Sequence, residues 1–275
     1  MVLILSLLLL AGPGPAPVSI PWKTLESGLE LAVVDAPRKS THADSKFTLV
    51  RIDPAHQRLR LLMASEVGGP KRTAPEWVRQ FGLSVVVNAG MFEARGDQST
   101  AHFFMQNGTH VNNPKVANQN AFLAFDPVDD SVPAVQIIDR RCQKFPALRK
   151  KYKTLIQGIR MVDCRQRNTW SLQPKKWSMV VVAMDKHDRL LFIFTRSPYR
   201  VRVFIQMLLS MPLDIRNMMY LEGGPEASLV VKSGDTRVEK FGSYETGFNP
   251  DDKNAEFWPV PNVIGLEGRM ASPAP

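Results

Sequence analysis

Short apolar segments separated by turn-forming residues are the feature that most restricts how this chain can fold. Runs rich in Val, Ile, Leu and Phe recur along most of the sequence, and each is followed by a cluster containing Asp, Asn, Gly or Pro. That pattern is typical of β-strands joined by tight connections. The sequence predicts strands at 29–34, 47–52, 58–63, 84–87, 101–105, 121–125, 134–138, 153–157, 179–184, 190–195, 217–221, 227–231 and 263–266.

Signals for helices are fewer. Thr73 and Glu76 can form a capping box that starts a helix, which Gly82 would end. A short helix is expected at 143–151, and another from Ser197, where a Ser N-cap precedes a proline. Many strands with few helices, in mixed order, predict the α+β class: a single domain with a mixed, mostly antiparallel sheet and a few flanking helices.

The two ends of the chain differ in composition from its middle. Residues 2–11 are apolar apart from one serine, and a Gly/Pro-rich stretch follows. About ten apolar residues are too few to span a bilayer, which needs about 20, but they suit a secretion signal. We expect a signal peptide at 1–17, a folded domain at 18–270 and a disordered tail at 271–275. The protein would then be secreted or periplasmic, without a stable membrane anchor after signal cleavage; a buried N-terminal strand is the alternative.

The two cysteines, Cys142 and Cys164, match no zinc-binding spacing. In an exported protein such a pair can form a disulfide, and two buried thiols are the alternative. Because we expect the chain to be exported, we also expect the two residues to be close and bonded.

The formal net charge of +9 is spread along the sequence. The densest basic cluster, at 140–153, lacks the interleaved aromatic residues of a platform for single-stranded nucleic acid. We interpret it as a solvated surface and expect no nucleic-acid partner. A basic surface would still attract anionic substrates or an anionic envelope.

Several common catalytic motifs are absent from the sequence. It contains no Gly-x-Ser-x-Gly elbow, no P-loop, no dinucleotide fingerprint and no His-Glu-x-x-His. The five histidines are scattered, so neither a metal site nor a cofactor is expected.

Two predicted loops follow the same sequence pattern. A buried strand ends at Asn88 and continues into Gly90, and a second ends at Glu222, followed by Gly223 and Gly224. The end of a core strand holds a polar side chain rigidly, and glycine lets the backbone approach a ligand closely. Exposed amides of such turns can also bind phosphate. If the loops are more than tight turns, Asn88 and Glu222 should face a common cleft.

Both loops resemble motifs of the phosphodiester glycosidase family. The segment 88–92, Asn-Ala-Gly-Met-Phe, resembles the family's Asn-Gly-Gly-Phe-Phe, and 221–229 resembles its Leu-Asp-Gly-Gly-Gly-Ser element. The resemblance extends over most of 45–266. The chain departs from the pattern at Ala89, at Pro225 and at Glu222, where the family has Asp. Since Glu is one methylene longer, its carboxylate needs a backbone adjustment to reach the position of the Asp carboxylate.

The resemblance implies a hydrolase that cleaves the bond between a sugar's anomeric carbon and a phosphodiester oxygen. A phosphorylated glycan or sugar phosphodiester would be its substrate. Glu222 would act as base, nucleophile or charge stabiliser, and Asn88 would orient the substrate. The other expected substrate-binding residues are Gly90, Met91, Gln157, Arg160, Arg196, Ser197, Gly223, Gly224 and Ser228, with the two arginines as phosphate ligands.

A non-catalytic secreted protein that binds phosphorylated or acidic glycans is the alternative function. Glu222 favours the enzyme, because a carboxylate weakens the binding of an anion. The oligomeric state stays open.

Overall fold

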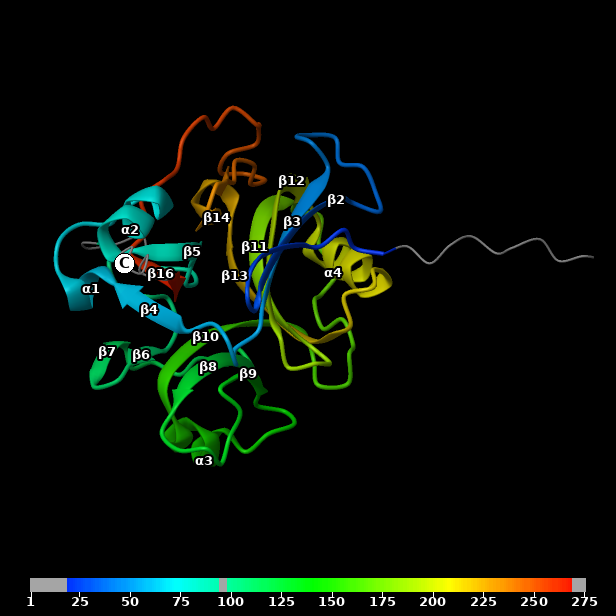
Figure 1. The fold of residues 1–275 in the computed structure, drawn as a ribbon. Coiled ribbons are helices and arrows are strands. Elements are labelled where there is room, and N and C mark those ends of the chain that lie inside the picture. Colours follow the sequence, from blue (N-terminus) through cyan, green and yellow to red (C-terminus); the bar gives the residue numbers. More distant parts are fainter. Residues whose placement is uncertain (1–18, 94–97, 269–275) are drawn as a thin grey trace, which may run out of the picture.

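Two antiparallel β-sheets form the centre of the protein (Figure 1). The computed structural model describes residues 19–93 and 98–268. Within these residues, the larger sheet has eleven strands: β1 (Lys23–Glu26), β2 (Leu29–Asp35), β3 (Lys46–Ile52), β6 (Met105–Asn107), β7 (His110–Asn113), β8 (Ala121–Pro127), β9 (Val135–Asp139), β10 (Tyr152–Val162), β11 (Trp177–Asp185), β12 (Leu190–Tyr199) and β13 (Ile215–Gly223). The smaller sheet has five: β4 (Leu59–Met63), β5 (Leu83–Asn88), β14 (Ser228–Ser233), β15 (Thr236–Phe241) and β16 (Asn262–Glu267).

The sheets pack against each other through one apolar face of each. Val182 and Phe192 of the larger sheet and Val87, Leu229 and Ile264 of the smaller one belong to the same buried cluster. Burying these side chains from both sheets supplies the main apolar driving force for the fold. The opposite faces of the two sheets are covered by helices.

Helix α2 (Ala74–Phe81) covers the outer face of the smaller sheet through Trp77, and α4 (Val201–Ser210) covers the larger sheet through Phe204. Figure 1 shows the resulting layers, with α2 and α4 on opposite sides of the two sheets. Two shorter helices, α1 (Ala64–Val67) and α3 (Phe145–Leu148), and the 3₁₀ turns η1 (Arg149–Lys151) and η2 (Gly224–Glu226) complete the described elements.

The α+β class and the antiparallel pairing are confirmed. The predicted capping box is present: the Glu76 carboxylate accepts from the Thr73 N–H at 2.8 Å, and α2 ends at Gly82 in the left-handed conformation. The short helix near 143–151 is also confirmed, as α3 followed by η1.

The helix expected to start at Ser197 is wrong at its beginning. Ser197 and Pro198 belong to β12, and α4 starts only at Val201. The pairing of β11 with β12 shifts register around these residues, and a proline fits such a bulge because it has no N–H to donate. The Ser197 hydroxyl accepts from the Ser45 N–H at 2.7 Å instead of capping a helix.

The strand expected at 101–105 is also wrong. Apart from Met105 at the start of β6, this stretch contributes only one isolated bridge, between Phe92 and Ala101. The pairing occurs further along, in the β6–β7 hairpin, where Gly108 takes a φ of 55°. Strands β1 and β15 were not predicted, since both are short, polar and at sheet edges.

A disulfide joins Cys142 to Cys164, with the Cα atoms 6.5 Å apart, which confirms the expected pairing. It closes a loop of 22 residues between the end of β9 and the end of β10. We expect the double substitution of Cys142 and Cys164 by Ser to lower the free energy of unfolding by about 3 kcal/mol, since the unfolded chain regains loop entropy. Urea unfolding of both proteins measures this, and identical midpoints would contradict it.

Within the described ranges, no helix combines the length and the apolar character needed to cross a membrane. The predicted signal peptide at 1–17 and tail at 271–275 lie outside the described residues.

Candidate active site

The site lies where β5 of the smaller sheet and β13 of the larger sheet end beside each other. The 3₁₀ turn η2 carries the chain from the end of β13 to β14, which pairs with β5. At this crossing the Ser228 N–H donates to Asn88 Oδ1 at 3.0 Å, and a Cβ placed on Gly90 would lie 3.9 Å from the carbonyl oxygen of Leu221. The two loops with the common design are therefore neighbours in space.

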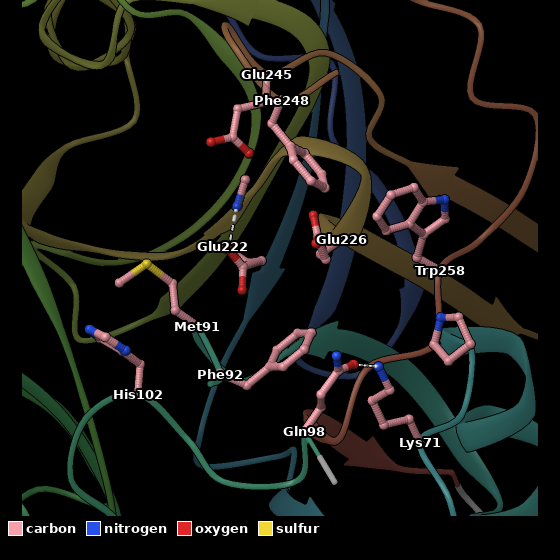
Figure 2. A pocket seen from close by; sticks show the side chains of 12 residues that line it. Lys71, Met91, Phe92, Gln98, His102, Glu222, Glu226, Glu245, Phe248 and Trp258 are labelled. Atoms are coloured by element: carbon pink, nitrogen blue, oxygen red, sulfur yellow. Dashed lines mark hydrogen bonds between the residues drawn. The ribbon is translucent and has the colours of Figure 1, made fainter. Parts of the chain in front are cut away.

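A cavity of about 570 Å³ opens at this junction (Figure 2). Glu222 and Gly223 reach it from the end of β13, and Met91 and Phe92 from the chain that follows β5. Its remaining lining residues come from four other segments: Lys71, Gln98, His102, Glu226, Glu245, Phe248, Trp258 and Pro259.

Glu222 is the most buried carboxylic acid of the pocket, with 9% of the residue exposed. Its Oε1 accepts from the Gly223 N–H at 3.0 Å. Burial raises the pKa of the Glu222 carboxyl well above its usual range, and the nearby charges of Glu226 and Glu245 raise it further, against the effect of that hydrogen bond. A carboxyl with a raised pKa is a stronger base than an ordinary carboxylate once it has lost its proton.

Glu226 and Glu245 place two more carboxyls around Gly224. This glycine has a φ of +68°, and a Cβ on it would lie 2.7 Å from Glu245 Oε2 and 3.3 Å from Glu226 Oε2. Burial raises the pKa of both carboxyls, and the charge of Glu245 adds to the effect on Glu226. Gly224 is thus required both by its backbone conformation and by the close approach of two acidic side chains.

The raised pKa of Glu222 predicts a pH-dependent cost to folding. The folded-state pKa of Glu222 exceeds the unfolded value of about 4.3, so protonation of Glu222 favours the folded state. This contribution to stability is lost as the pH rises through the folded-state pKa. We expect Glu222→Gln to unfold at a higher temperature than wild type at neutral pH and at nearly the same temperature at about pH 4. Melting curves at both pH values test this; a variant less stable at neutral pH would contradict it.

Lys71 lies on the side of the pocket that carries Phe92 and Gln98 (Figure 2). Its ammonium donates to Gln98 Oε1 and lies 5.4 Å from the centre of the Phe92 ring. His102, also on the lining, has Nδ1 2.9 Å from Glu93 Oε1. The pocket therefore contains one lysine ammonium in addition to its carboxyls, and the charge of Lys71 acts against the rise of the Glu226 pKa.

Two aromatic side chains complete the wall. Phe248 and Trp258 meet edge to face with ring centroids 6.0 Å apart, and Phe248 is 61% exposed. They belong to a long loop between β15 and β16 that also carries Glu245. The Ser178 hydroxyl accepts from the Ser243 N–H at 3.0 Å and so fixes the beginning of this loop on the larger sheet.

Arg196, predicted to bind phosphate, instead anchors this loop. Its Nε is 2.8 Å from Asp252 Oδ1, and its other nitrogens donate to the carbonyl oxygens of Phe241, Asp252 and Asn254. Arg196 is not part of the pocket lining, and its guanidinium is occupied by these four bonds. We infer that it positions the wall of the pocket.

Arg160, the second arginine predicted to bind phosphate, is also engaged elsewhere. It is buried, and its Nη1 pairs with Asp139 Oδ1 at 2.9 Å, beside the disulfide. Gln157 holds the preceding loop by accepting from the Ala117 N–H at 3.0 Å, and Ser197 is buried in β12. None of these side chains lines the pocket, so the structure does not bring them together with Glu222.

The other predicted site residues lie where β5 and β13 end beside each other. Glu222, Gly223 and Met91 line the pocket, and Gly90 and Gly224 are adjacent to lining residues in the chain. Asn88 and Ser228 are buried below it and bond to each other. The Asn88 Nδ2 has no hydrogen-bond partner within the described residues.

A metal-binding arrangement of acidic side chains is not found in the pocket as described. Across residues 19–93 and 98–268, the one group of potential ligands close enough to share an ion is Asp139, Cys142 and Cys164, where both sulfurs belong to the disulfide.

Comparisons with known proteins address the family and the fold of this chain. The model of a family described as phosphodiester glycosidase matches residues 81–267. The catalytic domain of zebrafish N-acetylglucosamine-1-phosphodiester alpha-N-acetylglucosaminidase, solved in a form auto-inhibited by its pro-peptide, is similar in structure, with a TM-score of 0.60 and 11% identity over 88% of this chain and 84% of that chain. A hypothetical protein from Synechocystis gives 0.61 and 13% over 91% of this chain and 64% of that one.

At such identities the two superpositions show a shared fold. A search of curated proteins finds no significant match to this chain.

Proposed function

The chain belongs to the phosphodiester glycosidase family, and from that premise we propose that it hydrolyses the bond between a sugar's anomeric carbon and a phosphodiester oxygen. The observation that carries this proposal is Glu222, a buried carboxyl with a raised pKa at the end of β13, facing a cavity large enough for a sugar ring. Its substrate class is a glycan or small sugar phosphodiester.

In the proposed step, water attacks the anomeric carbon while the bond from that carbon to the phosphate oxygen breaks. The electron pair leaves with the phosphate, which becomes a monoester, and the proton of the water passes to the Glu222 carboxylate. A phosphate is a good leaving group, so it needs little protonation. The reaction therefore depends more on a base for the attacking water than on an acid for the leaving group, and Glu222 supplies that base.

A carboxylate beside the anomeric carbon also favours the transition state over the bound substrate. The anomeric centre becomes oxocarbenium-like as the bond breaks, and a nearby negative charge stabilises that positive charge. The same charge repels the intact phosphodiester. Attraction in the transition state and repulsion in the ground state both lower the barrier from the bound complex.

Three carboxyls around one pocket disfavour the alternative of a pure anion binder. Glu222, Glu226 and Glu245 would each weaken phosphate binding when ionised. Phe248, which is exposed, and Trp258, which is half-buried, suit the apolar face of a sugar ring.

Incubation of the purified protein with a panel of sugar-1-phosphodiesters tests the proposal. We expect release of free sugar and a phosphomonoester from at least one member. A protein that binds members of the panel in calorimetry, yet releases no sugar from any, would support the non-catalytic alternative.

A further inference from the structure

We propose that Lys71 binds the phosphate group of the substrate, so that the sugar lies against Glu222 and the phosphate lies toward the Lys71 wall. This inference rests on the proposed function and adds to it the orientation of the substrate. Lys71 precedes the segment matched by the family model, which begins at residue 81. The residue therefore belongs to the part of the chain that the match does not cover.

The backbone next to Lys71 is fixed to the segment that carries Trp258 and Pro259. Arg72 forms a β-bridge with Val260: the Val260 N–H donates to the Arg72 carbonyl at 2.8 Å. Val260 directly follows Trp258 and Pro259, which line the pocket. The backbone from which the Lys71 side chain extends is therefore held next to the segment that carries Trp258 and Pro259.

The ammonium of Lys71 is positioned but still has donors to offer. It contacts the Phe92 ring and donates to Gln98 Oε1, and no carboxylate of the described residues lies within 4.0 Å of it. An ammonium carries three N–H donors, and the bond to Gln98 uses one. Two donors can thus turn to the oxygens of a phosphate, for which lysine acts as a point charge.

The charges of the pocket make the surroundings of Lys71 the most favourable place for an anion. Lys71 is the one Lys or Arg among the described lining residues (Figure 2). Of the three lining glutamates, Glu226 is close enough for the charge of Lys71 to act against the rise of its pKa, whereas Lys71 has no such effect on Glu222 or Glu245. His102 has its imidazole next to Glu93, which offsets any positive charge on the ring. A phosphodiester carries one negative charge at neutral pH and is repelled by ionised carboxyls, so it is stabilised best next to Lys71.

Lys71→Met tests the proposal, with Lys71→Arg and Lys153→Met as controls; Lys153 is exposed and is not a lining residue of the pocket. Each is assayed on a sugar-1-phosphodiester and on the neutral nitrophenyl glycoside of the same sugar. We expect Lys71→Met to lose about tenfold or more in kcat/KM on the phosphodiester beyond any loss on the neutral glycoside, mostly through KM, as for one charge-assisted hydrogen bond. Lys71→Arg should recover part of the loss, and Lys153→Met should match wild type. Equal losses on both substrates, or none on the phosphodiester, would overturn the proposal.

A titration with inorganic phosphate separates this proposal from the proposed function. If wild type hydrolyses neither substrate, the proposed function fails, but calorimetry still measures phosphate binding. Wild type binding phosphate about tenfold more tightly than Lys71→Met supports the role of Lys71. Equal affinities of the two proteins, or no binding by either, would overturn it.

Discussion

Glu222→Gln is expected to lower turnover by at least about 10²-fold while leaving the protein folded. The substitution keeps the size of the side chain and its acceptor for the Gly223 N–H, but removes the carboxylate that accepts a proton and stabilises the oxocarbenium-like centre. Because Gln cannot ionise, it also removes the cost of a buried charge. Loss of activity should therefore accompany equal or greater stability.

Glu267→Gln is the matched control for this experiment. Glu267 also ends a strand, β16, but it is exposed and pairs with Arg58 and Arg60 far from the pocket. Its substitution should leave kcat within about twofold of wild type, since exposed ion pairs contribute little. Full turnover by Glu222→Gln would refute the catalytic assignment, and an unfolded variant would indicate a structural role instead.

Gly223→Ala is expected to have the second large effect, because no side chain fits at this position. An added Cβ would overlap the Tyr220 hydroxyl and the Trp177 ring, and would lie 2.9 Å from the Ser178 carbonyl oxygen. Tyr220 is buried and Ser178 is part of the sheet backbone, so relief requires a shift at the end of β13. Overpacking of this kind costs about 1–3 kcal/mol.

That shift would also displace the neighbouring Glu222. A misplacement of about 1 Å in a catalytic group can cost on the order of 10²-fold in rate, so turnover should fall more than stability alone explains. Gly234→Ala is the control: it has a φ of +52° but open space around it, and it lies at the β14–β15 turn. It should cost roughly 1 kcal/mol without changing kcat. Equal kcat values for Gly223→Ala and wild type would contradict this explanation.

Local patterns in the sequence predict the two strand ends that meet at the site. The β-branched run before Asn88 and the apolar run before Glu222 each form a buried strand, and the polar residue and glycines that follow mark its end. Each strand pairs with other core strands and so buries its side chains. In the folded protein this pairing brings the end of β5 and the end of β13 together. That the two ends belong to different sheets was not predicted, because pairing over long distances leaves no local signal.

The rest of the pocket could not be predicted in the same way. Lys71, Glu245 and Trp258 come from connections whose positions depend on tertiary contacts such as the Arg72–Val260 bridge and the anchoring by Arg196. Arginine was expected to bind phosphate because of its chemistry alone. In the structure, the acidic partners Asp139 and Asp252 occupy both predicted arginines, and their identity could not be read from neighbouring residues. Glu226, in contrast, lies within the segment 221–229 that resembles the family motif, so the sequence does carry a signal for it.

Hydrolysis of a sugar-1-phosphodiester in water labelled with heavy oxygen tests the central claim most directly, because it identifies the bond that breaks. Attack at the anomeric carbon leaves the original bridging oxygen on phosphorus. The released phosphomonoester should therefore carry no label when examined by mass spectrometry or phosphorus NMR, and Glu222→Gln should release little of it. The phosphate is the product to examine, since the anomeric hydroxyl of a free sugar exchanges with water. Labelled phosphomonoester would mean attack at phosphorus and would contradict assignment of this protein as a glycosidase.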